Sequence, residues 1–124
     1  MRRSAIAFAL LAPLVIGAVS DKNAIPDATP VGKPVSCIPL TSIDTTRVHG
    51  DWVIDFHMRD RKVFRNTLPA ACPGLGFEER FGYQTSLSQL CSTDIITVLY
   101  TSPLQRGASC GLGEFQQVTL AAAH

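Results

Sequence analysis

The chain lacks the excess of positive charge that is typical of nucleic-acid-binding proteins. Its 124 residues include 11 Lys and Arg and 10 Asp and Glu. Removal of residues 1–20, which carry Arg2 and Arg3, leaves nine against ten, so the remaining chain is close to neutral. The one positive cluster lies in a predicted turn and is interrupted by Asp60; it consists of Arg59, Arg61, Lys62 and Arg65. No basic stripe is available to neutralise phosphates, and nucleic acid is therefore not an expected partner.

Several catalytic and cofactor motifs are also missing. None of the cysteines is spaced as CxxC, which excludes a redox motif or a zinc knuckle of that kind. No serine lies in a GxSxG elbow. The two GLG tripeptides lack the third glycine of a dinucleotide-binding loop. With no catalytic constellation visible, we expect no cofactor and favour a non-enzyme.

No apolar run is long enough for an ordinary membrane-spanning helix. The longest, residues 5–19, follows the positive start Met1-Arg2-Arg3, and Ala18-Val19-Ser20 provides small residues at both cleavage-determining positions. This run has about 15 residues, whereas a membrane-spanning helix needs roughly 20. Residues 1–20 are therefore predicted to be a secretory signal peptide, with no membrane span after cleavage. We expect an exported protein, either periplasmic or secreted.

Four cysteines are present, Cys37, Cys72, Cys91 and Cys110. An even number in a short exported chain predicts two disulfides. The sequence leaves all three pairings open. The favoured pairing joins Cys72 with Cys91 and Cys37 with Cys110, because it nests a short loop inside a long one and joins the two ends of the core. A core of this size contributes little stability by itself, so we expect the bridges to hold the fold.

The chain after residue 20 divides into three parts. Residues 21–36 contain three prolines among small and charged residues, which predicts a disordered, partly extended linker. Residues 37–120 are predicted to form a single β domain, and residues 121–124 a frayed tail.

The central feature of this domain is a predicted β-hairpin. Apolar residues at every second position, Trp52, Ile54, Phe56 and Met58, predict a half-buried strand. Residues 62–68 form the second strand. A three-residue loop at 60–62 is favoured, because it pairs apolar faces; it sets Met58 opposite Phe64, Phe56 opposite Asn66 and Ile54 opposite Leu68. The same arrangement places Asp55, His57, Arg65 and Thr67 on the more polar face.

Further strands are predicted on both sides of the hairpin. Residues 37–43 and 45–48 precede it, and residues 94–101, apolar on both faces, predict a central strand. Residues 103–107 are predicted to be a surface loop, and residues 108–120 one or two final strands. One short helix is expected at residues 86–90. The fold class is therefore all-β or mainly β, a small antiparallel barrel or sandwich of five to seven short strands stabilised by disulfides.

The chain also resembles a known family. The residues that carry the resemblance are Cys37 with Ile43, DWVIDFHM, VFRNTLPAACPGL, SLSQLCSTDIITVL and ASCGLGEF, which together span residues 37–118. They are similar to an uncharacterised bacterial family of small exported proteins, a domain of unknown function. The resemblance implies export and a disulfide-held fold. It implies no activity, cofactor or catalytic residue.

Asp55, His57 and His49 are the candidate metal ligands. Asp55 and His57 are two residues apart on one predicted strand and therefore share a face, and His49 lies in the preceding turn. Such a set offers two or three ligands to a metal such as zinc. The competing interpretation, which we favour, is a solvated strand face with an incidental histidine. Glu78 and Glu79 offer further carboxylates for acid–base chemistry, but adjacent residues point in different directions along an extended chain.

Aromatic residues are the other candidate binding surface. A surface for sugars, peptides or lipids would draw on Trp52, Phe56, Phe64, Phe77, Phe81 and Tyr83. Core packing is the favoured interpretation for most of these, because a domain of this size needs its large side chains inside. We expect Tyr83 and Tyr100 at a wet edge.

These observations favour a non-catalytic exported module that binds or stabilises a protein or envelope component. The alternative is a small metal-dependent or hydrolytic enzyme that uses Asp55 and His57.

Overall fold

The protein is described here by a computed structural model that covers residues 24–85, 87–101 and 103–121. The predicted signal peptide at residues 1–20 and most of the predicted tail lie outside these residues. Within them, no helix has both the length and the apolar character that crossing a membrane requires.

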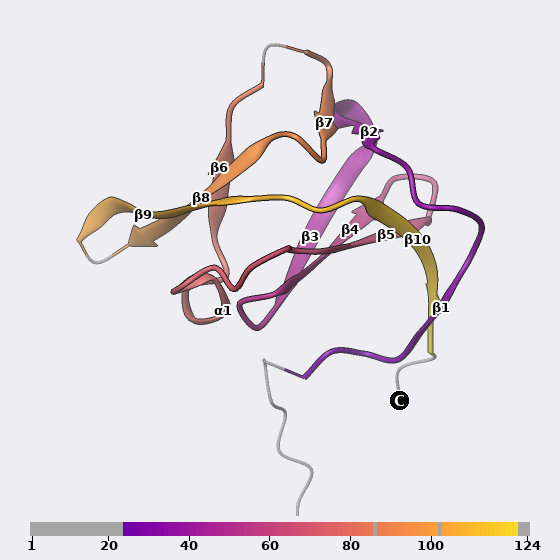
Figure 1. Cartoon of the computed structure of the whole chain (residues 1–124), viewed down its shortest axis with the longest axis horizontal. Helices are drawn as coiled ribbons and strands as arrows, with labels where there is room; N and C mark the ends of the chain where they lie inside the picture. Colours follow the sequence, from indigo (N-terminus) through magenta and orange to yellow (C-terminus); the bar gives the residue numbers. More distant parts are fainter. Residues whose placement is uncertain (1–23, 86, 102, 122–124) are drawn as a thin grey trace, which may run out of the picture.

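The described residues form ten strands in three antiparallel sheets (Figure 1). The first sheet has the order β1-β10-β5-β4-β3, and its strands are β1 (Ala28–Pro30), β3 (Ile43–His49), β4 (Val53–Met58), β5 (Val63–Thr67) and β10 (Phe115–Leu120). The second pairs β2 (Cys37–Pro39) with β7 (Gln89–Cys91). The third has the order β6-β8-β9, with β6 (Phe81–Tyr83), β8 (Ile95–Thr101) and β9 (Leu104–Gly111). The helices are a 3-10 turn, η1 (Leu40–Ser42), and α1 (Leu75–Glu78).

One hydrophobic core joins the three sheets. Its buried residues come from the first sheet (Ile54, Phe56, Phe115), the second (Ile38, Leu90) and the third (Ile96, Val98). The rings of Phe56 and Phe115 meet edge to face with centroids 5.5 Å apart, an arrangement that aromatic pairs prefer. The mainly β fold class is therefore confirmed, with one short α-helix. The strands exceed the expected five to seven because three strands of three residues each, β1, β6 and β7, form where no strand was predicted.

The β4–β5 hairpin has a different register from the predicted one. Phe56 lies opposite Phe64, Ile54 opposite Asn66 and Asp55 opposite Arg65. This register differs from the prediction by two residues, and a shift of two leaves every side chain on its expected face. The alternation of apolar and polar residues is therefore compatible with both registers. The turn distinguishes them, because the N–H of Arg61 donates to the Met58 carbonyl oxygen and Arg61 adopts a φ of 74°.

The described part of the predicted linker is ordered, so that prediction is wrong for residues 24–36. Strand β1 pairs with β10 along Ala28 to Pro30 (Figure 1). Val35 also forms a bridge with Phe115. The prolines are compatible with this pairing because β1 is an edge strand, and a missing N–H on its outer side removes no hydrogen bond of the sheet. The domain therefore begins before Cys37.

The helix expected at residues 86–90 does not form, although Ser86 itself lies outside the described residues. Gln89 and Leu90 belong to strand β7. Leu90 lies opposite Ile38 and is fully buried, and this tertiary pairing overrides local helix propensity. The prediction of a surface loop at residues 103–107 is also wrong, because β9 begins at Leu104 and pairs with β8.

Two disulfides are present, as predicted, but the favoured pairing is wrong. The bonds are Cys37–Cys91 and Cys72–Cys110. Cys37 and Cys91 lie directly opposite each other on β2 and β7, while Cys72–Cys110 links the segment before α1 to β9. The loops, with sequence separations of 54 and 38, interleave instead of nesting. In the chain-entropy model, a loop of either length stabilises the fold by about 4 kcal/mol.

Candidate functional site

The polar face of the β4–β5 hairpin carries a buried ion pair. Asp55 is 0% exposed, although the alternating pattern placed it on a wet face. Arg65, directly opposite on β5, binds it with two hydrogen bonds: Nε donates to Oδ1 at 2.8 Å and Nη2 donates to Oδ2 at 3.0 Å. His49 Nε2 lies 3.2 Å from Asp55 Oδ2. Both oxygens of this carboxylate are therefore engaged, in the bidentate geometry that arginine favours.

The N-terminal segment contacts this ion pair from outside the sheet. Arg65 Nη2 also donates to the carbonyl oxygen of Pro26 at 3.0 Å. A buried carboxylate needs a charged partner with good geometry, and Arg65 meets that need while tying residues 24–30 to β5. The arrangement is that of a structural ion pair.

His57 does not join Asp55 in a metal site. Within the described ranges, no group of three or more His, Cys, Asp or Glu side chains is arranged to hold a metal ion. Burial, followed by the positive charge of Arg47, lowers the pKa of His57, although Asp55 acts in the opposite direction. A metal at Asp55 would have to displace Arg65. The geometry therefore gives no support to a metal site formed by Asp55, His57 and His49.

The six candidate aromatics fall into two groups. Phe56 is buried, and Phe64 and Phe81 pack partly against the core. Trp52, Phe77 and Tyr83 are exposed, and Trp52 and Phe77 are 49% and 73% exposed. Tyr100 is partly buried against the core, and its hydroxyl lies 3.0 Å from the position that a Cβ on Gly74 would take.

Trp52 and Phe77 flank a groove of about 520 Å³ between the β3–β4 turn and α1. Three glycines, Gly50, Gly74 and Gly76, also line this Trp52 groove, and Ile25 of the N-terminal segment contributes to it. The turn and the helix approach closely: a Cβ on Gly76 would lie 2.8 Å from backbone atoms of Gly50.

Asp51 fixes this approach. Its Oδ1 accepts a hydrogen bond from the Gly76 N–H at 2.7 Å, and its carbonyl oxygen accepts one from the Cys72 N–H at 2.8 Å. The groove is therefore held by backbone contacts and by the adjacent Cys72–Cys110 disulfide. The segments HGDW and PGLGF, which form the two sides of the groove, each have the composition of a turn. Turn composition alone does not reveal that the two segments contact each other.

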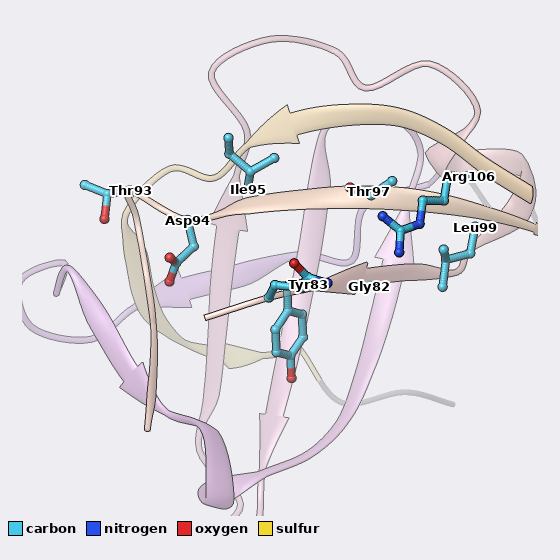
Figure 2. Close-up of a pocket in the computed structure, with 9 residues that line it drawn as sticks. Gly82, Tyr83, Thr93, Asp94, Ile95, Thr97, Leu99 and Arg106 are labelled. Carbon is cyan, nitrogen blue, oxygen red and sulfur yellow. The ribbon is translucent and has the colours of Figure 1, made fainter. Parts of the chain in front are cut away.

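A second hollow, of about 560 Å³, lies on the β6-β8-β9 sheet (Figure 2). Gly82 of β6, Ile95 and Leu99 of β8, and Arg106 of β9 contribute to its lining. We call it the Arg106 hollow. No motif in the sequence marks this hollow; its only sequence signal is that residues 94–101 are apolar on both faces of the strand.

Comparison of the chain with known protein families, with curated proteins and with solved structures found no match. The resemblance to an uncharacterised exported family therefore stays a prediction, and the site must be interpreted from its own geometry.

Proposed function

We propose that this protein is a non-catalytic exported module, periplasmic or secreted, that binds a protein component of the envelope through the Trp52 groove. The observation that carries the proposal is the exposure of Trp52 and Phe77, at 49% and 73%, on the two sides of one groove. Exposed large apolar side chains that cluster mark interaction sites, and tryptophan is enriched among the residues that dominate binding energy.

Two features support export. The chain carries two disulfides, which form and persist in oxidising compartments. Residues 1–20 have the pattern of a secretory signal peptide, with a positive start, an apolar run and small residues at the end.

The shape of the groove favours an extended segment of the partner. Gly50, Gly74 and Gly76 line the groove with backbone atoms, and internal contacts with Gly50 and Tyr100 occupy the positions that a Cβ on Gly76 or Gly74 would take. Ile25, which precedes Pro26 in the protein's own N-terminal segment, already lines the groove. An extended segment with an aliphatic side chain, placed between Trp52 and Phe77, fits this environment.

The test is a pull-down from an envelope extract of the source organism, with three forms of the protein compared. We expect a stoichiometric partner with the wild type and its loss with Trp52→Ala. Leu104→Ala is the matched control, because Leu104 is 80% exposed but lies on β9, outside the groove. It should retain the partner.

Trp52 also provides a direct readout, since it is the only tryptophan in the chain. Adding the purified partner should shift the tryptophan emission to shorter wavelength and protect it from acrylamide quenching. A partner that binds Trp52→Ala as well as the wild type, or that leaves the emission unchanged, would contradict the proposal.

A further inference from the structure

We propose that the Arg106 hollow is a second binding site, distinct from the Trp52 groove, and that it binds a carboxylate carried on an apolar body. Arg106 would pair with the carboxylate, and the apolar body would lie along β8. Three features of the hollow support such a site: its apolar floor, the space above Gly82 and the charge of Arg106.

The floor of the hollow follows from the alternation of β8. Ile96 and Val98 are fully buried in the core, so Ile95, Thr97 and Leu99, which alternate with them along the strand, face outward. Ile95 and Leu99 line the hollow with Thr97 between them (Figure 2). Ile95 is 56% exposed. This part of the strand therefore offers apolar surface to a ligand after the inner face has already been used for the core.

Gly82 keeps the space above this floor open. It lies opposite Thr97 in the β6–β8 pairing. A Cβ added at Gly82 would meet only one atom within 4 Å, Leu99 Cδ1, at the ordinary contact distance of 3.5 Å. Backbone packing therefore does not require a glycine here. The consequence of its missing side chain is room for a ligand.

Arg106 places a positive charge at one end of the hollow. It lies opposite Leu99 on β9, so both side chains project from the same face. Figure 2 shows its guanidinium directed back over the sheet, toward Thr97 and Gly82. Within the part of the chain that the structure describes, this guanidinium has no hydrogen bond or ion pair. A carboxylate can pair with it without displacing an internal partner.

Asp94 restricts the charge of the ligand. It contributes to the hollow near the start of β8, away from Arg106, and its Oδ2 accepts a hydrogen bond from the Cys91 N–H at 2.7 Å. At the strand rise of about 3.3 Å per residue, Ile95 and Leu99 are about 13 Å apart. A ligand that reaches from Arg106 toward Asp94 meets like charge if its far end is also anionic. The hollow should therefore prefer a monocarboxylate to a dicarboxylate.

The experiment is a titration followed by amide NMR shifts, with octanoate as the probe. Octanamide tests the charge, and octanedioate tests the effect of Asp94. We expect octanoate to shift the Gly82 and Leu99 amides and to bind about tenfold or more tightly than octanamide. Acetyl-trileucine with a free carboxylate, compared with its amide, tests whether a peptide C-terminus or a free aliphatic acid is the better source of the same chemistry.

Three variants separate the proposed causes. Arg106→Gln should weaken octanoate binding about tenfold or more, because it removes the charge. Arg61→Gln removes the same charge at the β4–β5 turn and should leave binding unchanged. Gly82→Val should fill the hollow and abolish binding while the protein stays folded, since a Cβ fits there and valine suits a strand.

The proposal is overturned if octanoate leaves the Gly82 and Leu99 amides unshifted, or if octanoate and octanamide bind equally. It is also overturned if folded Gly82→Val binds like the wild type. None of these measurements depends on Trp52. A negative result for the Arg106 hollow is therefore distinguishable from a negative result for partner binding at the Trp52 groove.

Discussion

The buried Asp55 carboxylate makes the protein's stability depend strongly on one residue. It is enclosed by the first sheet and bound by Arg65 at 2.8 Å, with His49 at 3.2 Å. Removing one partner of a buried pair leaves the other charge uncompensated, which costs more than the pair itself contributes.

We therefore expect Asp55→Asn to lower the free energy of unfolding by about 3 kcal/mol, measured by urea denaturation. Asp60→Asn is the control, because Asp60 and Lys62 form an exposed pair 3.7 Å apart. That variant should change stability by less than about 1 kcal/mol. Equal effects of the two substitutions would mean that Asp55 has no structural role.

His57 gives the protein a pH dependence of defined sign. Its pKa is lowered from the ordinary 6.5, first by burial and then by Arg47, with His49 acting in the same direction and Asp55 and Asp44 against it. The unfolded chain therefore binds this proton more readily than the folded chain, and the stability that neutral His57 contributes is lost as the pH falls below 6.5.

The measurement is the free energy of unfolding from about pH 7 to about pH 5, for the wild type and for His57→Gln. We expect the free energy of unfolding to decrease in both proteins as the pH is lowered, and to decrease less per pH unit in the variant. Identical slopes would show that His57 has the same pKa in the folded and unfolded states.

At the scale of elements, the loop between β9 and β10 is fixed by β5. Asn66 of β5 is fully buried, and its side chain donates to the Gly113 carbonyl oxygen at 2.7 Å and accepts from the Gly113 N–H at 2.8 Å. A Cβ on Gly113 would overlap the carbonyl oxygen of Thr67. A glycine is therefore required where this loop passes over the strand.

Gly113→Ala should lower the melting temperature clearly, because either the loop or β5 must shift. Gly111→Ala is a matched control two residues away, since a Cβ there meets nothing within 4 Å. We expect the control to melt within a few degrees of the wild type, in calorimetry of both proteins. Comparable losses would contradict the close contact at Gly113.

Alternation of apolar residues predicted the strand at residues 53–58, and a nearly continuous run of β-forming residues predicted the strand at residues 95–101. Alternation could not predict the register of β4 with β5, because a two-residue shift preserves both faces. It also placed Asp55 in solvent, since the pattern of one strand does not show that the N-terminal segment packs over the outer face. The Trp52 groove depends on contact between segments separated in sequence, which local patterns do not encode.

At the scale of the whole molecule, one disulfide lies within a sheet and the other joins two parts of the fold. Cys37–Cys91 crosses the second sheet, and Cys72–Cys110 joins the segment after β5 to the third. Sequence predicted two bonds from the even count but could not choose between pairings, because loop lengths say nothing about which strands lie side by side.

The pairing has a direct test in double variants. Replacing Cys37 and Cys91 by Ala should leave one disulfide and no free thiol, because Cys72 and Cys110 remain bonded. Replacing Cys37 and Cys110 instead should leave two free thiols. Thiol titration of the denatured, unreduced variants distinguishes these results, and the reverse pattern would support the nested pairing.

The most direct test of the view that cross-links hold this small β core is thermal unfolding of the purified protein with and without a reductant. Two disulfides that each stabilise by about 4 kcal/mol predict that reduction lowers the melting temperature by more than about 15 °C. An unchanged melting temperature, with reduction of both bonds confirmed by thiol titration, would contradict this account.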